Sequence, residues 1–133
     1  MEDGKVKNSM KTIVLCGSMK VKEDILNVHE QLKDKYNVLL PKECMEGLPK
    51  EIASRAHFNR IINDADAILV VNSTKNDIQN YIGPNSFCEI AFAFHFNKKI
   101  YLLNDIYTPY QDELLGWNSI PLKGNINYID ETI

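Results

Sequence analysis

The sequence predicts an α/β fold, specifically a flavodoxin-like, doubly wound parallel sheet of five strands with helices on both faces. Short runs of apolar and β-branched residues alternate with longer segments whose apolar residues recur at helical spacing. The short runs are apolar almost throughout, which is typical of parallel strands covered on both faces. Right-handed connections between such strands leave few topologies, and of these we expect the flavodoxin-like strand order.

The first half of the chain predicts two strands and two helices. "KTIVLC" (11–16) is an apolar run closed by Gly17, as in a buried strand. From residue 19 to about 35 the apolar side chains follow helical spacing, with charged residues between them. "YNVLLP" (36–41) predicts a second strand ended by its proline, and after a loop a helix is expected over about 50–63.

The second half predicts three more strands and a long helix. "ADAILVVN" (65–72) is the clearest strand in the chain. A proline suits the first turn of a helix over 84–97, which leads into a strand at "KKIYLLN" (98–104). "DELLGW" (112–117) predicts one or two helical turns, and "NINYI" (125–129) is the candidate for the fifth strand.

Length and charge indicate a single domain without a surface for nucleic acid or membrane. The 133 residues suit one core, so we expect a polar N-terminal tail over 1–10 and one domain over 11–133. The formal net charge of −3 gives no basic surface for a nucleic-acid polymer or an anionic membrane. There is no apolar run of the roughly 18–20 residues that a membrane span needs, and no signal-peptide pattern, so a cytoplasmic protein is expected.

The cysteines and histidines do not predict a metal site or a disulfide. Cys16, Cys44 and Cys88 are odd in number, widely spaced and without a C-x-x-C pair, as expected of reduced thiols. The three histidines lack ligand-type spacing, so we expect no metal and no cofactor. His57 and Arg60 share a helix face and are expected to be exposed, and Cys88 is expected to be a small core residue.

Three segments should meet at one edge of the predicted sheet. In doubly wound folds the ligand lies outside the carboxyl ends of the strands. The segments that follow the first and third strands, and the one that opens the predicted helix over 84–97, are "CGSMK", "NSTKND" and "IGPNSFCE". The candidate site residues from these segments are Cys16, Gly17, Ser18, Met19, Asn72, Asp77, Gly83, Asn85, Ser86 and Glu89.

Glu89 is unusual because it is a carboxylate inside a largely apolar helix. Burial of an unpartnered carboxylate costs several kcal/mol or neutralises the group. Asn85 and Ser86 lie one turn earlier, towards the expected cleft, and complete a polar trio suited to a small polar ligand. The alternative is a surface glutamate, or a buried one that pairs with an arginine.

The segments "CGSM", "DADAILVVN" and "GPNSFCEIAFAFHFNKKIYLLN" resemble the nucleoside 2-deoxyribosyltransferase superfamily, which includes 2′-deoxynucleoside 5′-phosphate N-hydrolases. The resemblance covers roughly residues 12–104. It implies that Glu89 is the nucleophile that attacks the anomeric carbon and forms a glycosyl-enzyme intermediate, as in retaining glycosidases. Water then resolves the intermediate in a hydrolase, and a second nucleobase resolves it in a transferase.

The chain departs from the transferase pattern at two positions. Transferases carry an aspartate where this chain has Gly83 and another where it has Asn72. Asp77 is the candidate for the missing carboxylate. These departures favour hydrolysis, preferably of nucleoside 5′-monophosphates, and leave open a non-catalytic nucleotide sensor or an NAD glycohydrolase. Tyr110 and Trp117 are candidates to stack on a base, although packing within the fold is the expectation.

The helix over 84–97 also predicts self-association. Phe87, Ile90 and Phe94 form the stripe expected to pack on the sheet, which leaves Phe92 and Phe96 on the other side. We expect either a second subunit or the loop 73–83 to cover the face that carries Glu89. A homodimer or a higher even oligomer is the simplest closed arrangement that would bury Phe92 and Phe96.

Overall fold

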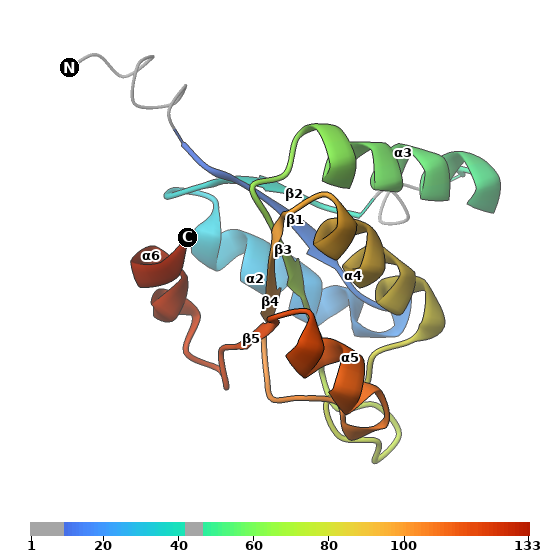
Figure 1. Ribbon diagram of the computed structural model, residues 1–133. Coiled ribbons are helices and arrows are strands. Elements are labelled where there is room, and N and C mark those ends of the chain that lie inside the picture. Colours follow the sequence, from blue (N-terminus) through green and yellow to red (C-terminus); the bar gives the residue numbers. More distant parts are fainter. Residues whose placement is uncertain (1–9, 42–46) are drawn as a thin grey trace.

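Five parallel strands form one sheet in the order β2-β1-β3-β4-β5, as Figure 1 shows. The structure is a computed structural model that describes residues 10–41 and 47–133. The strands are β1 (Thr12–Cys16), β2 (Asn37–Leu39), β3 (Ala67–Val70), β4 (Lys99–Leu102) and β5 (Ile120–Pro121). This is a flavodoxin-like arrangement, so the predicted fold class is confirmed.

Helices cover both faces of the sheet (Figure 1). They are α2 (Lys22–Leu32), α3 (Lys50–Asn63), α4 (Pro84–His95), α5 (Gln111–Gly116) and α6 (Ile129–Thr132), with the short 3-10 turns η1 (Met19–Val21), η3 (Thr108–Tyr110) and η4 (Ile126–Tyr128). One core cluster joins the sheet to α2 and α6, and the other joins it to α3, α4 and α5. The α3 bounds coincide with the predicted ones, whereas most strands are shorter than predicted.

The strand register aligns the carboxyl ends of the three central strands. Cys16 pairs with Val70, which in turn pairs with Leu102. The connections that leave these strands therefore begin at one edge of the sheet, where the sequence placed the cleft. Gly17 permits the first of these turns, because a Cβ there would lie 3.1 Å from Cδ1 of Ile25 and 3.3 Å from the carbonyl oxygen of Val71.

The predicted fifth strand at 125–129 is wrong. The fifth strand is β5, which pairs with β4 through only two residues, and the predicted segment instead forms η4 and the start of α6. Ile126 and Ile129 are three residues apart, which is helical spacing, and both pack into the cluster beneath α2. In "NINYI" polar and apolar residues alternate, as they do in a half-buried strand, but the packing of Ile126 and Ile129 on the same side requires a helical turn.

The side of α4 predicted to face the sheet is only partly correct. Its buried residues are Ser86, Glu89, Ile90 and Ala93, whereas Phe94 is 43% exposed. Small side chains on this face let the helix approach β3, β4 and α3 closely. Glu89 is therefore covered by α3 of the same chain, whereas the loop 73–83 or a second subunit was expected to cover it.

Candidate functional site

Glu89 lies in the second turn of α4, the helix that leaves the carboxyl edge of β3. Pro84 occupies the first turn of this helix and Gly83 is its extended N-cap residue. Glu89 is 7% exposed, so the surface alternative for this residue is wrong. Its ion-pair partner within residues 10–41 and 47–133 is a histidine, His57, and not an arginine.

His57 is the functional candidate that sequence reasoning missed. It was expected to be exposed, but it is only 1% exposed in the middle of α3. The buried residues of α3 are Ala53, His57 and Ile61, each four positions after the last, so His57 belongs to the stripe that packs on the sheet. That spacing was the signal available in the sequence, but it was weak, because His57 itself is polar and Arg60 on the next turn is charged.

The imidazole of His57 faces both a thiol and a carboxylate. Its Nε2 atom lies 3.6 Å from Sγ of Cys16 and 3.6 Å from Oε2 of Glu89. Cys16 is the last residue of β1 and is fully buried. The other ring nitrogen, Nδ1, has no hydrogen-bond partner within the described part of the chain. One strand and two helices thus bring a thiol, an imidazole and a carboxylate together below the surface.

Arg60, on the next turn of α3, serves a structural role. It is half-buried, and its guanidinium donates a hydrogen bond to the backbone carbonyl of Leu40, which ties α3 to the end of β2. Desolvation lowers the pKa of Arg60, and the charge of Asp64 opposes that shift. The prediction that Arg60 is exposed is therefore wrong. A long arginine side chain can be partly buried while its guanidinium group hydrogen-bonds to a backbone carbonyl oxygen.

Asn72 is buried and ties two loops together. Its Nδ2 donates to the carbonyl oxygens of Asp105 (2.7 Å) and Asn80 (3.5 Å), and its Oδ1 accepts the backbone N–H of Asn104 (2.9 Å). Asn104 in turn donates from Nδ2 to the carbonyl oxygen of Asn72 (3.2 Å). The side chain is thus engaged in positioning the connections that follow β3 and β4.

Asp77 lies at the tip of a tight turn in the β3–α4 loop. Lys75 and Ile78 exchange backbone hydrogen bonds of 3.0 and 2.8 Å, and both residues between them have positive φ, 50° for Asn76 and 65° for Asp77. Asn and Asp tolerate this left-handed conformation better than other non-glycine residues, and the pattern is that of a type I′ turn. The Asp77 side chain is exposed there.

The turn after β1 brings polar groups to the same edge of the sheet. Oγ of Ser18 accepts the backbone N–H of Lys20 at 3.2 Å and caps η1, while Met19 begins that turn. A groove of about 500 Å³ lies beside it, lined by residues 19–24 and Thr74. Of the remaining candidates, Ser86 is buried, Gly83 is half-buried and Asn85 is exposed, all at the start of α4.

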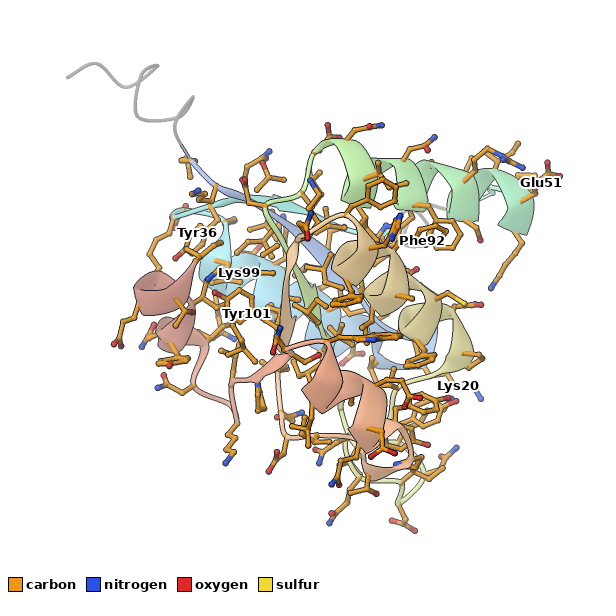
Figure 2. The ribbon with its side chains drawn as sticks, in the orientation of Figure 1. Lys20, Tyr36, Glu51, Phe92, Lys99 and Tyr101 are labelled. Carbon is orange, nitrogen blue, oxygen red and sulfur yellow. The ribbon has the colours of Figure 1, made fainter. Side chains whose placement is uncertain are left out.

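Two lysines converge at this edge. Nζ of Lys75 lies 4.7 Å from the ring centroid of Tyr81. Desolvation, and after it the charge of Lys20, lower the pKa of the Lys75 ammonium. Figure 2 shows Lys20 on the exposed side of the β1–α2 connection. The sequence pattern singled out neither lysine, because only the fold brings the two loops together.

The aromatic side chains near α4 pack against one another in a row. The ring of Phe87 lies 4.4 Å from that of Tyr110 and 5.6 Å from that of Trp117, and Trp117 also stacks on Phe94 at 5.3 Å. Tyr110 and Trp117 therefore pack within the fold, as expected, and hold α5 against α4. Cys88 lies on the outward face of α4 and is exposed, so its predicted place in the core is wrong.

Comparisons with family models, with curated proteins and with solved structures find no match to this chain. Within residues 10–41 and 47–133, none of the helices has the length and apolar character needed to cross a membrane.

Proposed function

We propose that this protein cleaves the N-glycosidic bond of a nucleoside or nucleoside 5′-monophosphate, with Glu89 as the nucleophile. The observation that carries the proposal is a carboxylate, 7% exposed, on the helix that leaves the carboxyl edge of the sheet. Its partner among the described residues is a histidine 3.6 Å away, which is longer than an N–H···O hydrogen bond. The carboxylate oxygens therefore keep lone pairs for chemistry instead of being held in a bidentate arginine pair.

In the proposed reaction one oxygen of Glu89 bonds to the anomeric carbon as the bond from that carbon to the base nitrogen breaks. The electron pair of the broken bond leaves with the base, which takes up a proton. Water then attacks the glycosyl ester, releases the sugar and a proton, and restores the carboxylate. Two displacements retain the anomeric configuration. A carboxylate suits this role because it is ionised near neutral pH without an activating base.

Hydrolysis is favoured over base transfer. The transferase pattern places an aspartate where this chain has Asn72, and the Asn72 side chain is bonded to three backbone groups of the neighbouring loops. It therefore supports the edge of the site and does not supply an acid. Asp77, on its exposed turn, remains the candidate carboxylate of that loop.

A 5′-phosphate would be bound by the charged edge of the site. Lys20 and Lys75 repel each other across two loops, and an anion placed between them would relieve that repulsion. The Ser18 hydroxyl and the backbone of η1 lie beside Lys20. We therefore favour nucleoside 5′-monophosphates over free nucleosides as ligands.

The second candidate function is a nucleotide sensor without turnover. The engagement of Asn72 in loop hydrogen bonds favours it, because a binding module needs ordered loops but no acid at this position. Incubation with deoxynucleosides, their ribose counterparts, the 5′-monophosphates of both and NAD separates the candidates. Chromatographic release of a free base supports the enzyme, whereas saturable binding without release supports the sensor. Release of nicotinamide alone would redirect the assignment to an NAD glycohydrolase.

We also assign the outward face of α4 to a second copy of the chain. Phe92 and Phe96 are 36% and 41% exposed, and Phe92 packs against Phe58 of α3 at a centroid distance of 4.7 Å. Figure 2 shows Phe92 between α3 and α4. Cys88, Ala91, Phe92 and His95 line a shallow, mostly apolar groove of about 320 Å³ on this face. A homodimer would cover it.

A further inference from the structure

The buried cluster of Cys16, His57 and Glu89 has the composition of a metal site. Each residue offers one donor atom, and the three atoms lie within 4.8 Å of one another. They come from β1, α3 and α4, so the sheet and two packed helices fix their positions. All three residues are buried, which distinguishes the cluster from the exposed acidic groups common on protein surfaces.

The two separations measured from the His57 imidazole suit donors arranged around a common ion. Bonds of about 2.3 Å to sulfur and about 2.0–2.1 Å to nitrogen and oxygen in a tetrahedron place sulfur about 3.6 Å from nitrogen and nitrogen about 3.4 Å from oxygen. The observed distances from Nε2 of His57 are 3.6 Å to Sγ of Cys16 and 3.6 Å to Oε2 of Glu89. The second of these exceeds the roughly 2.7–3.2 Å of an N–H···O hydrogen bond.

The geometry points to a zinc-binding site formed by Sγ of Cys16, Nε2 of His57 and a carboxylate oxygen of Glu89. Thiolate, imidazole and carboxylate are all ligands of Zn²⁺, and softer sulfur with imidazole disfavours Mg²⁺ and Ca²⁺. Three protein ligands leave a fourth position for water or another small ligand. Binding displaces the thiol proton, because the thiolate is the ligand.

Zinc at this site would inhibit the proposed glycosidic-bond cleavage, because an ion bound to the Glu89 carboxylate neutralises its charge and weakens it as a nucleophile. The regulatory consequence therefore rests on the proposed function, whereas metal binding itself does not. A chain that binds zinc but releases no base even when it is free of metal would overturn the proposed function alone. Base release that is insensitive to zinc, from a chain that binds none, would overturn the metal site alone.

Cobalt is the direct probe of the site. The full chain, reduced and treated with a chelator, is titrated with Co²⁺ and then with Zn²⁺. We expect one equivalent of Co²⁺ to produce thiolate-to-cobalt charge transfer in the near ultraviolet with the intense visible bands of a four-coordinate ion, and Zn²⁺ to abolish both. Cys16→Ser should remove the charge transfer, and Glu89→Gln should weaken binding more than about 100-fold, since even changes to residues that only hydrogen-bond to a metal ligand cost about 10–100-fold.

Cys88→Ser is the matched control, because this exposed thiol lies on the same helix as Glu89 but on its outward face. It should retain the full signal. Circular dichroism verifies that each variant is folded, and Glu89→Gln carries the test if Cys16→Ser does not fold. No charge transfer in the unaltered chain, its persistence in folded Cys16→Ser, or unchanged affinity in folded Glu89→Gln would overturn the site.

Discussion

Oε2 of Glu89 lies 3.6 Å from Nε2 of His57, and this contact joins the middle of α3 to the second turn of α4. Both side chains are buried: the side chain of Glu89 alone is 9% exposed, and that of His57 is 1% exposed. The contact therefore links the packing of the two helices to the chemistry proposed for the carboxylate. Removal of either partner should leave the other in an environment that penalises an unpartnered polar group.

The first prediction concerns catalysis by Glu89. Glu89→Gln keeps the size of the side chain but replaces the anionic nucleophile with an amide, so base release should fall by at least about 10³-fold. Chromatography of the released base measures the rate, and circular dichroism verifies the fold. Glu51→Gln is the matched control, because Glu51 is an exposed residue of α3 that pairs with the exposed Arg55 at 3.6 Å (Figure 2). Turnover by folded Glu89→Gln at the unaltered rate would refute the assignment.

The second prediction concerns the coupling of His57 to Glu89. Because the residues are in buried contact, His57→Ala, Glu89→Ala and the double variant should give an interaction free energy of about 0.5–3 kcal/mol in a double-mutant cycle. Urea unfolding supplies the free energies. His95, exposed on the outward face of α4, provides the control cycle with Glu89. Additive effects for the His57 pair would show that the 3.6 Å contact does not contribute to stability.

The sequence was sufficient to predict the fold, because the determinants of the sheet are local. Buried strands carry continuous apolar runs, and Pro84 marks the start of α4. It was also sufficient to single out Glu89 as a buried polar residue. His57 was missed because the spacing of Ala53, His57 and Ile61 is a weak signal, and because its contacts depend on the packing of α3 against β1 and α4. The pair Lys20 and Lys75 was missed for the same reason, since separate loops bring them together.

The third prediction is an acid-dependent loss of stability at the C-terminal helix. Asp130 accepts hydrogen bonds from Lys35 (2.7 Å) and from the Tyr36 hydroxyl, and these bonds lower its pKa. The pKa of Asp130 is thus lower in the folded state than in the unfolded state, where an aspartate has a pKa of about 3.9. Its ionised carboxylate therefore stabilises the fold fully above that unfolded value, and this stabilisation is lost as the pH falls through the folded pKa. Asp130→Asn should cost about 1 kcal/mol at neutral pH, a value reduced for solvent exposure.

Urea unfolding of Asp130→Asn and the unaltered chain at several pH values tests this. The difference in free energy of unfolding should stay constant above about pH 5 and shrink as the pH falls below about 4. Glu131→Gln, an exposed neighbour on the same helix, should show a much smaller difference. A difference for Asp130→Asn that does not change with pH would contradict the assignment of the acid sensitivity to this carboxylate.

The fourth prediction concerns phosphate recognition. Lys75→Met preserves most of the side-chain volume near Tyr81 but removes the charge, so it should weaken binding of a 5′-monophosphate by about 10-fold and leave nucleoside binding unchanged. Calorimetry in the Glu89→Gln background avoids turnover of the ligand. Lys11→Met is the control, because Lys11 is exposed just before β1, at the opposite edge of the sheet. Equal loss for nucleoside and monophosphate would argue against a phosphate contact.

The fifth prediction concerns assembly through α4. Phe92 and Phe96 remain 36% and 41% exposed, and burial of a phenylalanine side chain contributes roughly 1.5–3 kcal/mol relative to exposure. Because a two-fold axis would bring the same face of both copies together, Ala91→Glu places two carboxylates near each other in the groove. We expect sedimentation of the unaltered chain as a dimer at micromolar concentration and of Ala91→Glu as a monomer.

Leu115→Glu is the control for this prediction. It adds the same charge at a residue that is 55% exposed on α5, so it should remain dimeric. An unaltered chain that sediments as a monomer, or dissociation by both substitutions, would exclude this face of α4 as the specific contact.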